Sequence, residues 1–348
     1  MRTGRLFYKI SVGGQYRYSI LFSNIIDSTY ADGSASRKNL ICNSWTIHRG
    51  RIGKCVRFDL QKNLSDLWMD DTDGESDISV ADFREMTFDG KLSKEVQPGE
   101  FFSCDPVLLD FQANEYLCLE LTFSGTMIPY HEETLLPVFI QEGASWRYAP
   151  YMPFAAMIGC DRNIKKSVVY LGDSITQGIG TKPNTYLHWS ALLSEKIGYD
   201  YSYWNLGIGY ARANDAASDG AWLYKAKQGD IIFVEFGVND ILQGRSFEQI
   251  GADLFHVVTI LKHEEKKVIL QTLPPFDYDD SAAQQWARVN QYIKKELKGR
   301  VDFLFDNVLY LGQKERPHFT RYSDHPNEEG SRILADAFYE QLIQNNIF

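Results

Sequence analysis

The stretch from Val168 to Gly178 constrains the fold more than any other part of this sequence. It begins with the short apolar run VVYL, which is typical of a buried β-strand, and continues through Gly172-Asp173-Ser174 toward a helical pattern. A serine at this point follows the carboxyl end of a strand, where α/β proteins bind their ligands. Its exposed hydroxyl and its own N–H then have the placement that a nucleophile requires. Taken alone, the tripeptide favours a plain turn with Ser174 as a helix N-cap.

Strand and helix patterns alternate through residues 161–348. Asp230–Phe236 is apolar except for Glu235, as expected of a parallel strand that is covered on both faces. The alternation predicts an α/β fold, a three-layer α/β/α sandwich around a flavodoxin-like parallel sheet. Further strands are predicted at Tyr201–Asn205, Lys267–Leu273 and Val301–Phe305, and helices at Leu187–Ile197, Phe247–His263, Trp286–Leu297 and from Pro326 onward.

Residues 1–160 have a different pattern, which predicts an all-β sandwich of the jelly-roll type. Short runs rich in aromatic and β-branched residues are separated by Gly, Asn, Asp and Pro, and no helical period is sustained. A chain of 348 residues is long enough for two cores, so we expect one domain at 1–160 and a second at 161–348. The predicted strands are Tyr16–Phe22, Ser44–His48, Cys55–Leu60, Leu108–Phe111 and Tyr116–Phe123.

Charge and composition exclude several classes of partner. The formal net charge is −10 at pH 7, which argues against binding to nucleic acid or to an anionic membrane. No run is long and apolar enough to span a bilayer, and the N-terminal sequence MRTGRLFYKISVGG has no signal-peptide core. We therefore expect a soluble, cytoplasmic protein.

Two further groups of residues invite a metal or disulfide interpretation. If Gly74 were the sixth residue of an EF-hand loop, the first and twelfth would be Met69 and Val80, which cannot bind calcium. We therefore expect a solvated acidic loop there and no metal site. For the cysteines we expect buried free thiols. The acidic residues are Asp70, Asp71, Asp73, Glu75 and Asp77, and the cysteines are Cys42, Cys55, Cys104, Cys118 and Cys160.

Four segments with chemically useful side chains follow predicted strands or precede the last helix. They contain Ser174, Asn205–Tyr210, Gly237–Asp240 and Asp324–Asn327. The carboxyl ends of parallel strands meet at one sheet edge, so these segments are expected to converge. The sequence therefore predicts one site that contains a serine, a histidine and an asparagine.

These residue types suit acyl transfer. Ser174 would attack a carbonyl carbon, while His325 takes its proton as general base and returns it to the leaving alcohol. The Asn239 amide and the backbone N–H groups of Ser174 and of the Gly209–Tyr210 turn would stabilise the oxyanion. Supporting roles in the turns are expected for Asp173 and Asp240.

The second half of the chain, roughly residues 165–348, resembles the SGNH branch of the GDSL hydrolases. Gly172-Asp173-Ser174 matches the first block of that family, Gly237-x-Asn239-Asp240 the third and His325-Pro326-Asn327 the last. The first half is similar to the jelly roll found ahead of SGNH domains in some carbohydrate esterases, through Ser11–Asn24 and Val96–Leu109. The resemblance implies O-deacetylation of a polysaccharide or oligosaccharide, without a cofactor.

Two positions depart from the family pattern. The glycine that usually follows the second-block Asn by five residues is Tyr210 here, with Gly209 as an alternative donor. The acid that usually precedes the histidine by three residues is Tyr322, and the nearest acid is Asp324. Either a Ser–His dyad or a triad that uses Asp324 is therefore expected.

The leading hypothesis is a serine esterase that removes acetyl groups from a small-molecule or oligosaccharide ester. One alternative is a carbohydrate-binding protein whose hydrolase activity has weakened, which the missing acid motivates. A lipase or thioesterase for longer acyl chains is the other. Fold alone does not choose among substrates, and the sequence does not indicate an oligomeric state.

Overall fold

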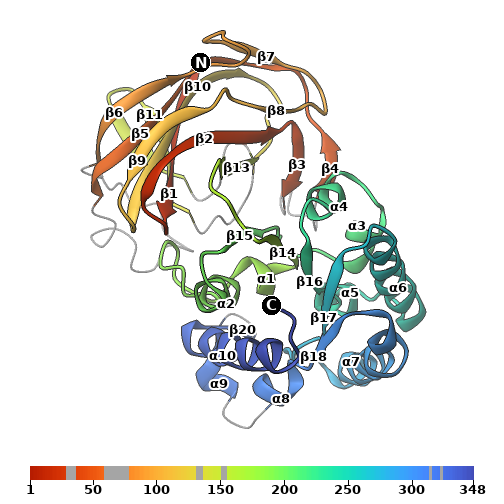
Figure 1. The fold of residues 1–348 in the computed structure, drawn as a ribbon. Coiled ribbons are helices and arrows are strands. Elements are labelled where there is room, and N and C mark those ends of the chain that lie inside the picture. The colour runs from red at the N-terminus through yellow and green to blue at the C-terminus, as the bar shows by residue number, and fades with distance from the viewer. Residues whose placement is uncertain (29–36, 59–77, 131–135, 150–154, 313–315, 322–323) are drawn as a thin grey trace. The chain divides into compact units, whose positions relative to one another are not determined.

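The computed structural model describes residues 1–28, 37–58, 78–130, 136–149, 155–312, 316–321 and 324–348 (Figure 1). The predicted acidic loop, Asp70–Asp77, and Tyr322 lie outside these residues. Two compact units are present. We call the described parts of 1–30, 37–163 and 182–184 the N-terminal unit, and those of 164–181 and 185–348 the C-terminal unit.

The described strands of the N-terminal unit pair in an antiparallel manner, and no helix occurs among its described residues. They are β1 (Arg2–Ile10), β2 (Gly14–Ser23), β3 (Ile25–Ser28), β4 (Arg37–Ile41), β5 (Trp45–Phe58), β6 (Ile78–Met86), β7 (Lys94–Val96), β8 (Phe101–Ser103), β9 (Val107–Phe111), β10 (Glu115–Gly125), β11 (Val138–Glu142), β12 (Ser145–Tyr148) and β13 (Ala155–Cys160).

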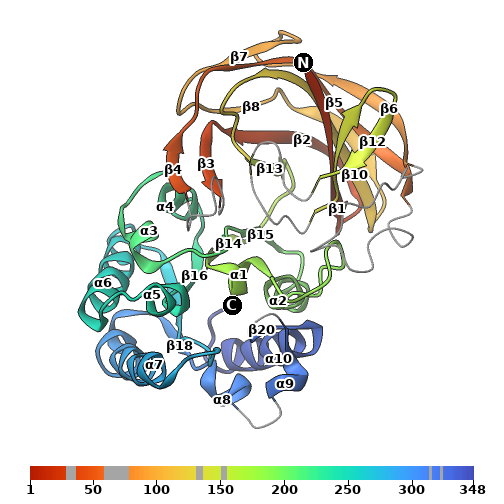
Figure 2. The same cartoon turned by 180° about the vertical axis from the view of Figure 1, so that it is seen from behind.

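These strands form a β-sandwich, as predicted. One sheet has the order β12-β11-β1-β10-β5-β6, with β7 also paired to β5, and the other has the order β13-β2-β8, with β9 paired to β2. Figure 2 shows the strands of this unit from behind. The core is shared by both sheets, since Leu6 and Leu119 of the first are packed with Ile20 and Phe22 of the second.

One strand prediction in this unit is wrong. The sequence predicts Ser44–His48 and Cys55–Leu60 as separate strands, but β5 is continuous from Trp45 to Phe58 and includes residues of both, while residues 59–60 lie outside the described residues. Gly50 and Gly53, which would suit a turn, instead lie inside the β5–β10 ladder. Pairing with a long neighbouring strand thus outweighs the local turn signal.

The five cysteines are free thiols, and one of them departs from the predicted burial. Cys42, Cys104 and Cys118 are buried and Cys55 is half-buried, whereas Cys160 is exposed.

The C-terminal unit has a five-stranded parallel sheet with the order β15-β14-β16-β17-β18. Its strands are β14 (Lys166–Gly172), β15 (Tyr201–Asn205), β16 (Ile231–Glu235), β17 (Lys267–Gln271) and β18 (Phe303–Phe305), besides the short pair β19 (Thr320–Arg321) and β20 (His325–Pro326). Its helices are α1 (Ser174–Gln177), α2 (Trp189–Ile197), α3 (Ala213–Ala217), α4 (Ala221–Ala226), α5 (Val238–Leu242), α6 (Phe247–His263), α7 (Asp280–Tyr292), α8 (Val308–Leu311), α9 (Arg316–Phe319) and α10 (Glu328–Gln344). Helix α7 is continued by the π-helix Ile293–Leu297 and the 3-10 turn Lys298–Arg300.

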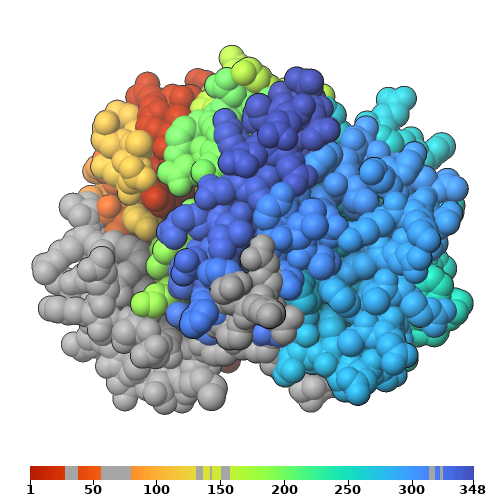
Figure 3. All heavy atoms as spheres, turned by 90° about the horizontal axis from the view of Figure 1, so that it is seen from below, coloured from red at the N-terminus to blue at the C-terminus, as the bar shows by residue number. Residues whose placement is uncertain are grey.

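Side chains of the sheet alternate between two cores, which confirms the predicted three-layer sandwich. Val169 and Leu171 of β14 pack with α3, α4, α6 and α7 on one face. Val168 and Tyr170 pack with α2, α8 and α10 on the other. The outer surface of the C-terminal segment, dark blue, is visible in Figure 3.

Several helix boundaries differ from prediction because capping residues outweigh the apolar pattern. Helix α7 begins at Asp280, capped by Asp279, and not at Trp286. Pro326 does not open the last helix as predicted, because it pairs with Thr320 instead, and Asn327 caps α10. None of the described helices has the length and hydropathy needed to cross a membrane.

The aromatic stack around Phe338 provides a test of this fold. Its ring stacks on Trp189 and Phe305, at centroid distances of 5.2 and 3.5 Å. We expect Phe338→Ala to lower the free energy of unfolding by about 3–5 kcal/mol, because the cavity lies between a helix layer and the sheet. Urea unfolding followed by tryptophan fluorescence measures this.

The matched control is Phe255→Ala in α6, where the side chain is 37% exposed. Its loss is expected to be about 1 kcal/mol or less. Equal losses in the two variants would contradict the packing described for Phe338.

Candidate active site

Ser174 is the first residue of α1, and one residue separates it from the end of β14. The N-cap of α1 is Asp173, whose Oδ1 accepts a hydrogen bond from the Ile175 N–H at 2.9 Å. Ser174 therefore does not serve as the cap, and its hydroxyl is available for another partner. The buried indole of Trp189 donates to the Ile175 carbonyl at 3.0 Å, which anchors the far side of this short helix.

His325 is that partner. Its Nε2 lies 2.8 Å from Ser174 Oγ, although 151 residues separate the two in the sequence. The imidazole belongs to β20, where His325 pairs with Arg321, and its ring packs edge-on against Phe276 at 5.2 Å. The predicted Ser–His pair is thus assembled with the geometry of a nucleophile and its base.

A glycine makes room for the histidine segment. Gly180 has φ +101°, a conformation that favours glycine, and a Cβ there would lie 2.6 Å from the Pro326 carbonyl oxygen. The loop after α1 can therefore approach the backbone of residues 325–326 only without a side chain at this position.

Asp324 lies in the turn just before His325. Its φ is +74°, and its Oδ1 accepts a hydrogen bond from the Thr320 hydroxyl at 3.2 Å. This bond joins β19 to the residue that directly precedes His325. Asp324 is thus bonded within the turn of the predicted site.

The loop after β15 is held against α1 by Asn205. Its Nδ2 donates to the Thr176 carbonyl at 2.8 Å, and its Oδ1 accepts from the Gly207 N–H at 2.8 Å. A Cβ at Gly207 would lie 2.2 Å from the Gln177 nitrogen, so no side chain fits there. The Ile208 N–H donates to the Gly172 carbonyl at 3.0 Å and completes the attachment.

Tyr210 has the backbone conformation of a glycine. Its φ is +56°, and its side chain is 45% exposed. A bulky residue in this region of φ is strained, and such strain often marks a functional turn. Tyr210 thus adopts the left-handed conformation that a glycine adopts more readily.

Asn239, in α5, bridges two parts of the site. Its Nδ2 donates to Asp173 Oδ2 at 3.3 Å and to the Ala211 carbonyl at 3.1 Å. The residue is buried. The predicted amide donor is thus bonded to the residue that caps the helix of Ser174.

Asp240 is the residue after Asn239, and no described contact bonds it to Ser174 or His325. Its carboxylate is buried and accepts from the Ala213 N–H at 2.9 Å and from Arg245 at 3.1 Å. Burial raises its pKa to about 6, against the lowering effect of these two donors. Asp240 therefore fixes the start of α3 relative to α5.

Glu235 is the residue whose role the sequence analysis missed. It ends β16, is buried, and accepts from the Thr176 hydroxyl at 3.3 Å. Burial first, and the neighbouring Asp173 carboxyl second, hold the pKa of Glu235 well above its ordinary value. The signal was present in the sequence, since Glu235 is the single charged residue within the apolar run Ile231–Phe236.

An apolar wall lies beside these polar groups. Ile175, Val238 and Phe276 form one buried cluster, with Tyr278 packed against it. Two of these residues are sequence neighbours of Ser174 and Asn239, and Phe276 touches the imidazole of His325.

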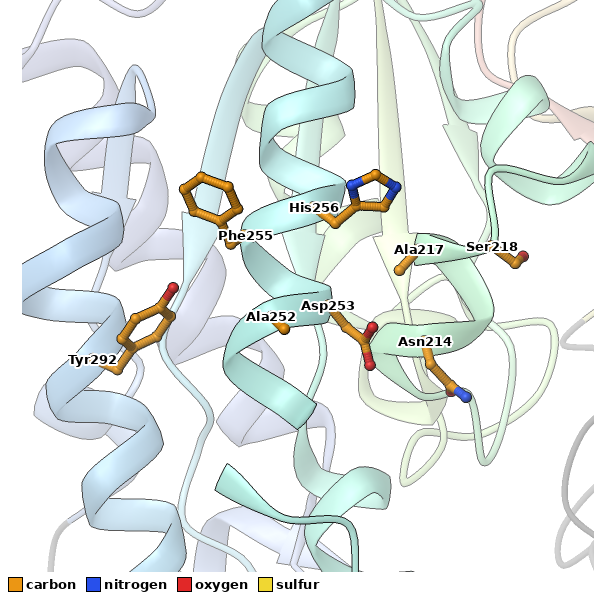
Figure 4. Close-up of a pocket in the computed structure, with 8 residues that line it drawn as sticks. All are labelled: Asn214, Ala217, Ser218, Ala252, Asp253, Phe255, His256 and Tyr292. Carbon is orange, nitrogen blue, oxygen red and sulfur yellow. The ribbon is translucent and has the colours of Figure 1, made fainter. Parts of the chain in front are cut away.

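A separate surface groove of about 720 Å³ lies over α6 (Figure 4). Asn214 and Ala217 of α3, Asp253 and His256 of α6, and Tyr292 of α7 line it. None of the predicted site residues is among its lining. Within the described ranges, no group of three or more His, Cys, Asp or Glu side chains is arranged to hold a metal ion.

Comparison with known structures finds three useful likenesses. A psychrotrophic esterase from Pseudoalteromonas sp. aligns at 17% identity over 52% of this chain and 99% of its own, with a TM-score of 0.42. An acetyl xylan esterase aligns at 23% identity over 51% and 99%, also with a TM-score of 0.42. A family two carbohydrate esterase from Clostridium thermocellum aligns at 9% identity over 99% and 91%, with a TM-score of 0.44.

A comparison with curated protein sequences finds no match. The family model of the GDSL-like lipase/acylhydrolases does match, over residues 170–333. That span includes Ser174, the Gly209–Tyr210 turn, Asn239 and His325, which the structure arranges around one edge of the parallel sheet. Residues 170–333 of the C-terminal unit are therefore similar to the GDSL-like lipase/acylhydrolase family.

Proposed function

We propose that this protein is a serine esterase that hydrolyses short acyl esters, with acetyl groups on an oligosaccharide as its substrate. The observation that carries the proposal is the 2.8 Å contact between Ser174 Oγ and His325 Nε2. It lies within a domain whose family is described as lipases and acylhydrolases.

The reaction would proceed through an acyl-enzyme. His325 removes the Ser174 proton as the oxygen attacks the ester carbonyl carbon, and the imidazolium then protonates the departing alcohol. A water molecule, deprotonated by the same imidazole, attacks the acyl-enzyme, and the proton returns to Ser174 as the acid leaves. Each half of the reaction restores the neutral histidine.

The oxyanion would be stabilised by N–H groups from three segments. The Ser174 backbone, the Gly209–Tyr210 turn and the Asn239 amide are the candidates, and each such donor is worth about 2.7–4 kcal/mol. Both present acceptors of Asn239 Nδ2 belong to the protein. The amide would therefore exchange one of these bonds for the substrate oxygen.

Two features support a short acyl group and a sugar. The apolar wall of Ile175, Val238 and Phe276 lies close to the reacting groups and is small. The β-sandwich unit ahead of the hydrolase domain resembles the arrangement in some carbohydrate esterases, so we propose an accessory role for it. A net charge of −10 is consistent with an uncharged substrate and not with nucleic acid.

The nucleophile is tested by Ser174→Ala. We expect hydrolysis of p-nitrophenyl acetate to fall to the buffer level, a loss of about 10⁶-fold, because no other group replaces the attacking oxygen. The thermal unfolding midpoint should match that of the wild type. Turnover retained by the variant, or a wild type that cleaves octanoyl faster than acetyl esters, would contradict the proposal.

The oxyanion loop is tested by Gly207→Ala. The added methyl group meets the backbone of Gln177, so the loop must move away from α1 and carry its N–H groups with it. We expect kcat to fall by about 10²–10³-fold, the loss typical of one missing donor. Gly299→Ala is the matched control, since a methyl group there would meet no atom within 4 Å and its φ lies outside the left-handed region; equal effects in both variants would argue against this role.

The role of Asp324 is tested by Asp324→Asn. The Thr320 bond supports a role in shaping the turn, and an asparagine oxygen accepts that bond equally well. We expect kcat to fall less than about tenfold, whereas loss of an acid that orients the histidine costs about 10⁴. A loss near the larger figure would establish the triad instead of the dyad.

A further inference from the structure

Two buried carboxyl groups, those of Asp173 and Glu235, lie next to each other beside the turn that carries Ser174. Glu235 pairs with Gly172, the residue before Asp173, across strands β14 and β16, which places the two carboxyl groups close together. Two negative charges in such a contact, away from water, are strongly unfavourable, so the pair holds one proton between them. The reaction described above uses neither carboxyl group directly.

The hydrogen-bond donors around the pair show which residue holds the charge. Asp173 accepts from the Ile175 N–H at 2.9 Å and from Asn239 Nδ2 at 3.3 Å. Among the described groups, Glu235 accepts a single bond, from the Thr176 hydroxyl at 3.3 Å, and its Oε1 accepts from none of the described N–H and O–H groups. The carboxylate is therefore Asp173, and the neutral acid is Glu235.

The surroundings favour this assignment. The Asp173 carboxyl is the neighbouring charge that, after burial, raises the pKa of Glu235. Burial first, and the carboxyl groups of this region second, raise the pKa of the phenol of Tyr278, in the loop before α7. Asp240, in α5, is paired with Arg245, so that cation is already engaged.

We propose that Glu235 is a positioning residue of the active site, which donates a hydrogen bond as a neutral acid to Asp173 and so fixes both α1 and the Asn239 amide. The inference rests on the proposed esterase function. Asp173 holds Ser174 through the cap of α1 and holds Asn239 through its second oxygen. Loss of the Glu235 proton would place two carboxylates in contact and displace Asp173 from both partners.

The sign of the pH dependence follows from the raised pKa of Glu235. Its unfolded value is close to the ordinary 4.5, and the folded value is well above that. The stabilisation by this proton is complete below about pH 4.5 and is lost progressively as the pH rises toward the folded pKa. Within this window one bound proton changes the unfolding equilibrium constant tenfold per pH unit.

The first experiment compares kcat and KM for p-nitrophenyl acetate in Glu235→Gln and Glu235→Leu at pH 7. Glutamine retains both a donor for Asp173 and an acceptor for Thr176, so its kcat should stay within threefold of the wild type. Leucine fills the space without a donor, and its kcat should fall about 100-fold with KM nearly unchanged. Equal kcat values in the two variants would overturn the inference.

The second experiment measures urea unfolding from pH 4.5 to 8. As the pH rises, the wild type should lose stability relative to Glu235→Gln, with an unfolding equilibrium constant that increases by up to tenfold per pH unit. The control is Glu195→Gln, at an exposed position of α2, and its stability should follow that of the wild type. Parallel curves for wild type and Glu235→Gln would overturn the inference, even if Glu235→Leu fails to fold. A wild type that cleaves no ester would refute the proposed function, and this measurement would still decide whether Glu235 holds the proton.

Discussion

The carboxyl ends of parallel strands meet at one edge of their sheet, and the candidate active site depends on this constraint more than on any single contact. Strands β14 and β16 are neighbours, so the turns that follow them bring Ser174 and Asn239 together. His325 comes from a distant part of the chain and reaches the same edge through the short β19–β20 pair. The position of the serine is thus set by the sheet, and that of the histidine by a turn.

Several buried polar side chains lie around Ser174, next to the apolar strands of the sheet. A buried polar network of this kind is stable only when each of its members has a hydrogen-bond partner. Asp173 meets this requirement through bonds to α1 and α5. Glu235 meets it only as a neutral acid. The site is therefore rigid at the nucleophile and sensitive to one proton.

Much of this arrangement could be predicted from the sequence, because apolar periodicity and strand ends are local signals. Helix α6 has the predicted bounds, Phe247–His263, and the convergence of Ser174 and Asn239 follows from strand order. The features that could not be predicted are set by tertiary contacts. Pairing with β10 keeps β5 extended through Gly50. The role of Glu235 could not be predicted, because it depends on the position of Asp173 beside it in the folded chain.

The alternation of side chains along β14 has a consequence for how the chain tolerates insertions and deletions. Each residue of a strand advances the chain by about 3.3 Å and reverses the face of the next side chain. One residue added between Val168 and Val169 would exchange Val169 and Tyr170 between the two cores, and it would also move the serine oxygen beyond reach of the imidazole. The number of residues in this segment is therefore as strictly determined as their chemical character.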